Sequence, residues 1–252
     1  MKRILTFILT LTLALSFCVN SFAAATTATA SETQTGTSEA QTDTSKTQAG
    51  TSEAQTDTSK VQAGASYGIS NLSGAPDIVA ESAVVMDANT GTILYGKEAD
   101  TKRYPASITK VMTALLAVEN CKMSDVITYS NAAVNGIEAG SSTAGINVGA
   151  KLTVEDSLYA LMLVSANEAA AAIAEHISGS TTEFAKLMTK RAKELGCTNT
   201  QFKNPHGLPN EEHYTTAHDM GLILKEAMKH EEFRKISGTI SYTLKKSDTL
   251  KD

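Results

Sequence analysis

The sequence is poor in cysteine and has no excess of basic residues. Only three cysteines occur in 252 residues, and Cys18 lies in the apolar segment at the amino terminus. The other two, Cys121 and Cys197, could pair in an oxidising compartment or could be small buried side chains, and we favour the second interpretation. A framework of several disulfides is therefore excluded. The formal net charge of −5 makes the chain a poor candidate for binding nucleic acid.

Several motifs that carry metal, nucleotide or hydrolase chemistry are also absent. The five histidines form no His-Glu-x-x-His pair, so no metal site is expected. No Gly-x-Ser-x-Gly elbow is present, so the sequence lacks the motif that would indicate a Ser-His-Asp hydrolase. No glycine-rich phosphate loop is present either. The sequence therefore shows none of these usual motifs of metalloenzymes and nucleotide-binding proteins.

One long apolar run is present, and it lies at the amino terminus. A short basic start at residues 1–3 is followed by almost entirely apolar residues 4–18 and by a small-x-small pattern at residues 21–23. The run is too short for a stable membrane span and is typical of a secretory signal peptide. We therefore expect residues 1–23 to be a signal peptide and the protein to be exported.

The segment that follows has the composition of a linker. Residues 24–66 are rich in Thr, Ser, Gln, Ala and Gly and almost free of large apolar side chains. An eleven-residue sequence at 36–46 is repeated at 50–60. Such a segment cannot bury enough apolar surface to offset its ordering entropy, so we expect a disordered spacer before a folded domain at 67–252.

The folded part is expected to begin near Pro76 with a β-hairpin. Apolar runs at 82–87 and 92–95 flank a turn in which Gly91 can supply a positive φ. After Pro105 the sequence is apolar on nearly all sides over 107–119, which predicts a buried helix.

The rest of the chain predicts mostly helices with little strand. Helix caps and stops mark the ends of several segments, for example Thr153, either Thr215 or Thr216, Gly179 and Gly196. The expected elements are a strand at 126–129, a loop at 135–149, helices at 153–164, 167–177, 182–195 and 215–229, and the start of a strand at 240–244.

A serine and a lysine three residues apart stand at the start of the first predicted helix. Ser107-Ile108-Thr109-Lys110 is the only Ser-x-x-Lys in the sequence. Residues i and i+3 share one helix face, so the hydroxyl and the amine can approach each other. A serine is a weak nucleophile without a base, and a buried lysine can be that base. The spacing fits acyl transfer through a serine ester, although an ordinary polar helix start has the same pattern.

Two further polar segments interrupt apolar sequence. Ser165 and Asn167 lie between two predicted helices, where they could cap the second helix or face a cleft. In the functional interpretation Ser165 relays a proton and Asn167 binds a substrate amide. The segment 204–208, Asn-Pro-His-Gly-Leu, predicts a turn, and His206 taken alone is more often structural than catalytic.

The order of these motifs resembles the low-molecular-mass penicillin-binding proteins, and more narrowly the serine D-alanyl-D-alanine carboxypeptidases. The resemblance covers residues 76–245. It depends on four segments, each weak alone and specific in this order. They are Asp87-Ala-Asn-Thr-Gly-Thr-Ile-Leu-Tyr95, Pro105-Ala-Ser-Ile-Thr-Lys110, Ser165-Ala-Asn-Glu-Ala-Ala170 and Asn204-Pro-His-Gly-Leu208.

The resemblance implies a fold and a role for each site residue. The fold would be α+β, with helices packed on an antiparallel sheet, as in β-lactamases and penicillin-binding proteins. Ser107 would be the acylated nucleophile, Lys110 its general base, Ser165 the proton relay and Asn167 a substrate-binding residue. Residues 140–142 would lie at the rim of the cleft. The chemistry needs no metal or organic cofactor.

The sequence departs from the family pattern at the third motif. The family carries Lys-Thr-Gly on a later strand, and no Lys-Thr-Gly occurs here. Lys245-Lys-Ser-Asp248 is no substitute, because glycine is needed where the strand backbone approaches substrate. We therefore expect a chain truncated before that motif, with C-terminal strands and a C-terminal membrane anchor missing and little or no activity in this form.

The leading functional hypothesis is a serine carboxypeptidase that removes the terminal D-alanine from peptidoglycan stem peptides. β-Lactams would acylate the same serine as inhibitors. The protein would act outside the cytoplasm, at the cell wall or the outer face of the membrane. One alternative is a serine β-lactamase of the same fold, although Glu168 is not placed like a deacylating glutamate. The other alternative is a non-catalytic cell-wall-binding module.

Overall fold

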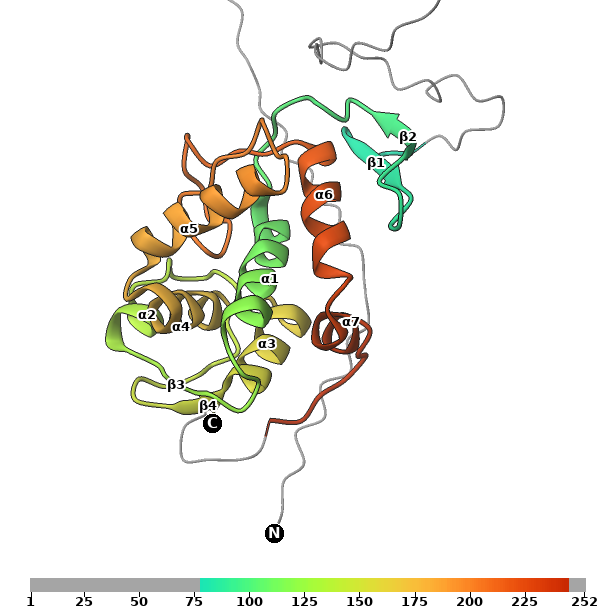
Figure 1. The fold of residues 1–252 in the computed structure, drawn as a ribbon. Helices are drawn as coiled ribbons and strands as arrows, with labels where there is room; N and C mark the ends of the chain where they lie inside the picture. Colours follow the sequence, from blue (N-terminus) through green and yellow to red (C-terminus); the bar gives the residue numbers. More distant parts are fainter. Residues whose placement is uncertain (1–77, 245–252) are drawn as a thin grey trace, which may run out of the picture. The chain divides into compact units, whose positions relative to one another are not determined.

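Helices and two small antiparallel sheets make up the part of the chain that the computed structural model describes, residues 78–244 (Figure 1). The predicted signal peptide at 1–23 and linker at 24–66 lie outside these residues. No helix within 78–244 is both long enough and apolar enough to span a membrane.

The predicted hairpin is confirmed. Strand β1 (Ala83–Met86) pairs with β2 (Ile93–Lys97) in antiparallel register, with a bulge between Val85 and Met86. Gly91 has φ +80° in the connecting turn, a conformation that glycine adopts without strain. The turn residues that the sequence supplies therefore produce the expected local structure.

The segment around the Ser-x-x-Lys pair forms a helix in two parts. A single 3₁₀ turn, η1 (Ala106–Thr109), leads into the α-helix α1 (Lys110–Asn120). The prediction of one helix from residue 107 is thus corrected, because Ser107 belongs to the 3₁₀ turn and Lys110 is the first residue of the α-helix. Ala106 has φ +48°, so the chain enters this turn through a left-handed residue.

The remaining helices follow the predicted order and have several of the expected caps. Thr153 and Thr216 accept backbone N–H groups at their helix starts, and Gly179 ends its helix with φ +76°. The elements are β3 (Val126–Thr128), α2 (Asn131–Asn135), β4 (Lys151–Thr153), α3 (Val154–Leu163), α4 (Asn167–Ser178), α5 (Thr181–Glu194), α6 (Ala217–Ala227) and α7 (Glu231–Ser237).

Three of these elements have no counterpart in the sequence predictions. Helices α2 and α7 are short, and β4 pairs with β3 at the far end of the predicted loop. Short elements carry too few residues for a periodic pattern. The strand predicted at 240–244 is wrong for the residues described. There Tyr242 stacks on Tyr159 with ring centroids 3.7 Å apart and donates its hydroxyl to Asp156.

Helix α1 lies at the centre of the helical part. It packs against α3, α4, α5, α6 and α7, which surround it (Figure 1). Its buried side chains include Met112, Leu115 and Leu116. Helix α4 contributes a buried run of small residues, Ala169–Ala172, which lets neighbouring helices approach closely.

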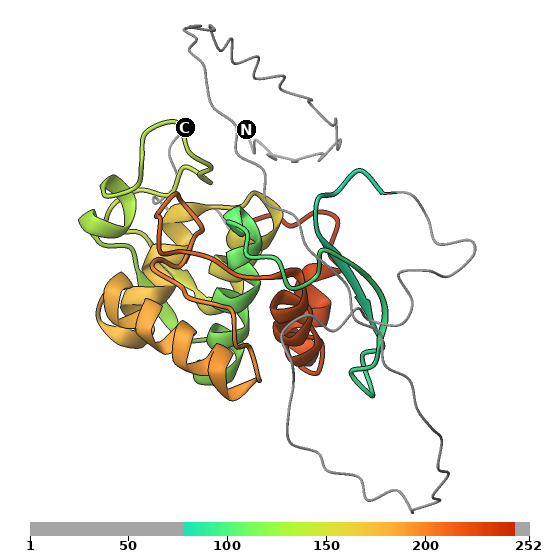
Figure 2. The ribbon, with the colours of Figure 1, turned by 90° about the horizontal axis from the view of Figure 1, so that it is seen from above.

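The hairpin packs on one side of α6 (Figure 2). Gly221 in α6 permits this approach, because a β-carbon there would lie 3.0 Å from Cγ1 of Val84. Cys121 and Cys197 are both free thiols, so they form no disulfide, and Cys197 is buried while Cys121 is half-buried. Only Cys197 therefore matches the interpretation of the two cysteines as buried side chains.

Candidate active site

The hydroxyl of Ser107 is exposed on the η1 turn, directly above a buried lysine. Lys110 is only 3% exposed, and its Nζ donates a hydrogen bond to Oγ of Ser107 at 3.3 Å. Nζ also donates to the backbone carbonyl of His206 at 2.9 Å. These two hydrogen bonds orient Nζ of Lys110 toward Oγ of Ser107.

Burial sets the protonation of this amine. It lowers the pKa of Lys110 from its ordinary value to about 8, although the negative charge of Glu168 acts in the opposite direction. A lysine with this pKa has an appreciable neutral fraction near neutral pH. The neutral amine can accept the proton of a serine hydroxyl.

Ser165 completes a chain of three polar groups. It lies between α3 and α4, and its Oγ donates to Oγ of Ser107 at 3.1 Å. Ser165 has φ +57°, an unusual conformation for a residue with a β-carbon. This strained backbone lies at the point where the side chain meets the nucleophile turn.

Asn167 lies close to these groups in sequence but makes different contacts. It is the first residue of α4, and its side chain is buried. The cap of α4 is Ala166, so Asn167 does not act as the N-cap that its residue type allowed. Its backbone N–H donates to the carbonyl of Ser142. Ser142 belongs to the predicted rim segment 140–142, and we call the loop 140–146 that contains this segment the rim loop. Within residues 78–244, no hydrogen bond joins its side chain to Ser107, Lys110 or Ser165.

The turn at 204–208 lies against the η1 turn and the start of α1. The carbonyl of Pro205 accepts a hydrogen bond from Oγ1 of Thr113 at 2.6 Å, one turn beyond Lys110 in α1. Gly207 has φ +86°, and a β-carbon there would overlap the carbonyl group of Ala106. The turn therefore holds both the lysine and the chain entering the serine turn through its backbone.

His206 contributes its carbonyl rather than its ring to this arrangement. Burial, followed by the charges of Lys110 and His213, lowers the pKa of His206 to about 4. Its Nδ1 accepts the N–H of Leu208 at 3.2 Å, which makes a neutral ring that braces the turn. The structural interpretation of this histidine is therefore supported, with an added backbone role that residue types alone could not reveal.

Glu168 is a buried residue near the site for which the sequence analysis gave no role. It is 2% exposed, and its Oε1 accepts hydrogen bonds from the rim loop. The only sequence signal was its place directly after the Ser-x-Asn triplet. A buried carboxylate whose charge acts on a buried lysine is a property of the tertiary structure.

One group of residues within 78–244 has ligand atoms close enough to suggest a metal. Glu119, Glu226 and His230 lie together, away from the serine. Arg191 already supplies a cation there, with Nη2 at 2.7 Å from Oε1 of Glu119 and 3.7 Å from Oε1 of Glu226. This group is an ion-pair network joining α1, α5 and α6.

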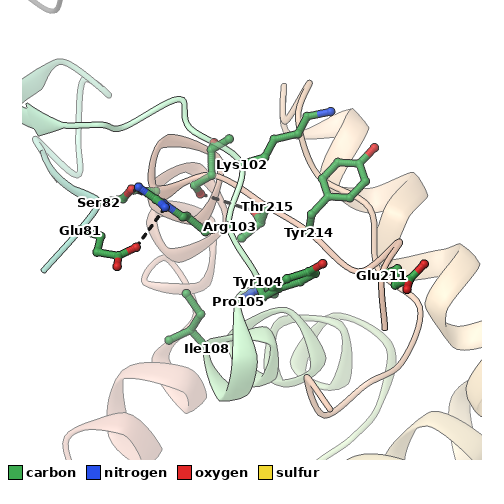
Figure 3. Close-up of a pocket in the computed structure, with 12 residues that line it drawn as sticks. Glu81, Ser82, Lys102, Arg103, Tyr104, Pro105, Ile108, Glu211, Tyr214 and Thr215 are labelled. Carbon is green, nitrogen blue, oxygen red and sulfur yellow. Dashed lines mark hydrogen bonds and ion pairs between the residues drawn. The ribbon is translucent and has the colours of Figure 1, made fainter. Parts of the chain in front are cut away.

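A pocket of about 710 Å³ borders the serine turn on the side of the hairpin (Figure 3). Ile108, the residue after Ser107, lines it together with Tyr104 and Pro105. Arg103 crosses its wall and pairs with Glu81 at 3.0 Å. The pocket offers aromatic and aliphatic surface next to the turn that carries Ser107.

A serine, a buried lysine and a second serine in hydrogen-bond contact define the class of sites in which a lysine activates a serine for acyl transfer. The chain belongs to the D-alanyl-D-alanine carboxypeptidase family, Peptidase_S11, whose family model matches residues 70–251. This match includes Ser107, Lys110, Ser165 and the turn at 204–208.

Relatives of known sequence and structure agree with this assignment. D-alanyl-D-alanine carboxypeptidase DacF of Bacillus subtilis is 42% identical over 177 residues, which cover 68% of this chain and 45% of DacF. The carboxypeptidase DacD of Francisella tularensis superposes with a TM-score of 0.60 at 37% identity over 64% of this chain and 40% of DacD. Penicillin-binding protein 5 of Haemophilus influenzae superposes with a TM-score of 0.61 at 33% identity. The match covers 64% of this chain and 49% of that protein.

These comparisons confirm the predicted family and fold class. The fold is that of the penicillin-binding D,D-peptidases, with helices and small antiparallel sheets. The chain spans less than half the length of DacF and of the two solved structures.

Proposed function

We propose that this chain carries the acylation centre of a serine D-alanyl-D-alanine carboxypeptidase that acts on peptidoglycan stem peptides. The observation that carries the proposal is the contact of Nζ of Lys110 with Oγ of Ser107 at 3.3 Å, with the pKa of Lys110 lowered to about 8. Membership of the D-alanyl-D-alanine carboxypeptidase family supplies the substrate class.

The reaction would proceed in two halves: Ser107 is first acylated, and the ester is then hydrolysed. Nζ of Lys110 takes the proton of Ser107 as Oγ bonds to the carbonyl carbon of the penultimate D-alanine. Ser165 passes that proton to the amine of the departing terminal D-alanine. Asn167 orients the peptide, and water then cleaves the ester and restores Ser107.

The same proposal assigns the segments of the chain. Residues 1–23 would direct export, 24–66 would be a spacer, and 67–252 would form the penicillin-binding domain. Export would bring the site to the cell wall, where it would serve peptidoglycan synthesis and cell shape. β-Lactams would acylate Ser107, because they imitate the acyl-D-alanyl-D-alanine group.

Labelling of the purified chain with a fluorescent penicillin tests the proposal. We expect one adduct by intact mass, located on Ser107 by peptide mapping and abolished by Ser107→Ala. Ser141→Ala, in the rim loop, is the matched control and should label normally. A folded wild-type chain without an adduct would overturn the proposal and favour a wall-binding module.

The lifetime of the adduct distinguishes the carboxypeptidase from a β-lactamase of the same fold. A β-lactamase must hydrolyse the penicilloyl ester rapidly, and in many such enzymes a glutamate assists. Oε1 of Glu168 is occupied by donors of the rim loop, which favours a slow step here. An adduct lasting minutes or longer agrees with the carboxypeptidase, and rapid turnover of penicillin contradicts it.

A further inference from the structure

Glu168 is a buried carboxylate whose two oxygens have very different surroundings. Oε1 accepts hydrogen bonds from Oγ1 of Thr143 at 2.6 Å and from the N–H of Ala144 at 2.7 Å, with the N–H of Ile146 at 3.5 Å. Oε2 is buried and has no hydrogen-bond partner among the described residues. A buried polar atom without a partner is costly, so this position calls for a compensating interaction.

The rim loop is joined to the start of α4 at two adjacent residues. Glu168 binds the loop through its side chain, and Asn167 binds it through its backbone N–H, which donates to Ser142 at 3.0 Å. Ser165, two residues earlier, has a positive φ that persists only when its surroundings hold it. The loop therefore fixes the backbone that presents Ser165 to Ser107.

The charge of Glu168 acts on the buried lysine. Lys110 at the start of α1 and Glu168 in the first turn of α4 are 3% and 2% exposed, and the two helices pack against each other. The two side chains form no direct ion pair, but Glu168 is the charged group that opposes the effect of burial on the pKa of Lys110. The charge of Glu168 also acts on Tyr129, whose pKa is raised mainly by burial, so Tyr129 stays neutral as well. In the segment that packs against the η1 turn, the titratable groups near Lys110 are His206 and, next to it, His213. The pKa of each is lowered to about 4, so both are neutral near neutral pH.

We propose that Glu168 is a positioning residue of this site, which clamps residues 142–146 of the rim loop to the start of α4 and supplies the counter-charge for the Lys110 cation. This inference depends on the proposed function for its catalytic meaning. When Oγ of Ser107 forms its bond to the acyl carbon, its proton moves to Nζ of Lys110. The ammonium formed there is buried, and the carboxylate of Glu168 stabilises it electrostatically.

Two substitutions separate the charge from the clamp. Glu168→Gln keeps an oxygen for the loop donors but removes the charge, so it should lower the pKa of Lys110 by about one unit. Thr143→Val keeps the charge but removes the contact with Glu168, together with the hydrogen bond that Oγ1 of Thr143 accepts from the N–H of Gly145. It should therefore leave that pKa unchanged and loosen the loop. Glu175→Gln, seven residues further along α4, is the matched control for loss of a carboxylate.

Two measurements on the purified full chain read these effects without requiring activity. The pKa of Lys110 is obtained from the pH titration of ¹³C-labelled lysine side chains, assigned with Lys110→Arg. Amide hydrogen exchange reports the loop, and Ala144 should exchange at least about tenfold faster in Thr143→Val than in Glu175→Gln. A third readout requires acylation. In Glu168→Gln, the pH at which the acylation rate falls on the acid side should move down by the same amount as the measured pKa of Lys110.

The outcomes are distinct from those for the proposed function. If the pKa of Lys110 is the same in Glu168→Gln as in Glu175→Gln, the counter-charge role is wrong. If Thr143→Val leaves exchange at Ala144 unchanged, the clamp is wrong. A wild-type chain that takes up no penicillin overturns the proposed function, while the titration and the exchange still decide the role of Glu168.

Discussion

At the scale of single residues, Lys110 has to be both buried and able to gain a proton. Burial stabilises the neutral amine, and the charge of Glu168 limits the shift, so its pKa falls to about 8. The protonated amine cannot act as a base. In the proposed mechanism, the balance between desolvation and a single carboxylate therefore sets the pH at which the serine becomes reactive.

We predict that penicillin acylation depends on pH through this one group. Below pH 8 the neutral fraction of Lys110 falls about tenfold per pH unit, so the acylation rate should rise with unit slope and level off above about pH 8. Acylation rates measured across this range with a fluorescent penicillin check the prediction. A rate independent of pH between about 6 and 9 would show that another group is the base.

Substitution of the lysine gives a second test at this scale. Arginine stays protonated at any relevant pH, so Lys110→Arg should reduce acylation by about 10²- to 10⁴-fold. Lys122→Arg, at an exposed position after α1, should label like the wild type. If Lys110→Arg retained the wild-type rate, the proposed role of the lysine would be wrong.

At the scale of elements, the turn 204–208 and the η1 turn depend on each other. The turn accepts Nζ of Lys110 at the carbonyl of His206 and places Gly207 against the carbonyl of Ala106. Glycine is required there for two reasons, its positive φ and the absence of a β-carbon. The nucleophile turn is thus shaped by a segment about a hundred residues away.

Substitution of Gly207 tests this dependence. Gly140 also has a positive φ, +82°, but a β-carbon there meets nothing within 4 Å. Gly140→Ala should cost only the backbone strain of about 1–2 kcal/mol in the free energy of unfolding. Gly207→Ala should cost clearly more and should also reduce penicillin labelling, as measured by denaturant unfolding and labelling of the refolded protein. Equal losses in the two variants would contradict the close packing described here.

At the scale of the whole molecule, α1 joins the site to the core. The helix begins at Lys110 and packs against α3, α4, α5, α6 and α7. The lysine therefore has its backbone in a helix that five other helices surround. Loss of packing in this helix should affect stability first and the site second.

We predict a large destabilisation when the centre of this helix is truncated. Leu115 is 0% exposed, so Leu115→Ala should lower the free energy of unfolding by about 2–5 kcal/mol through a cavity in the core. Leu224→Ala, at a residue that is 44% exposed in α6, should cost much less. Urea unfolding of the two variants measures the difference. Similar values would show that α1 is not the centre of a cooperative core.

Much of the local structure was determined by the sequence. The hairpin around Gly91, the helix starts at Thr153 and Thr216 and the stop at Gly179 were all predicted, because caps and turns involve residues only a few positions apart. The Ser-x-x-Lys spacing likewise brought Lys110 to Ser107 within one turn of chain.

The tertiary structure alone decided how these pieces form a site. The contacts of Lys110 with His206, of Ser165 with Ser107 and of Glu168 with the rim loop join segments 96, 58 and 24 or 25 residues apart. Residue types do not reveal which carbonyl accepts a hydrogen bond from a lysine or which buried carboxylate affects the pKa of that lysine. Those outcomes depend on the packing of α1 against α4 and the 204–208 turn, and desolvation in that packing sets the pKa of Lys110.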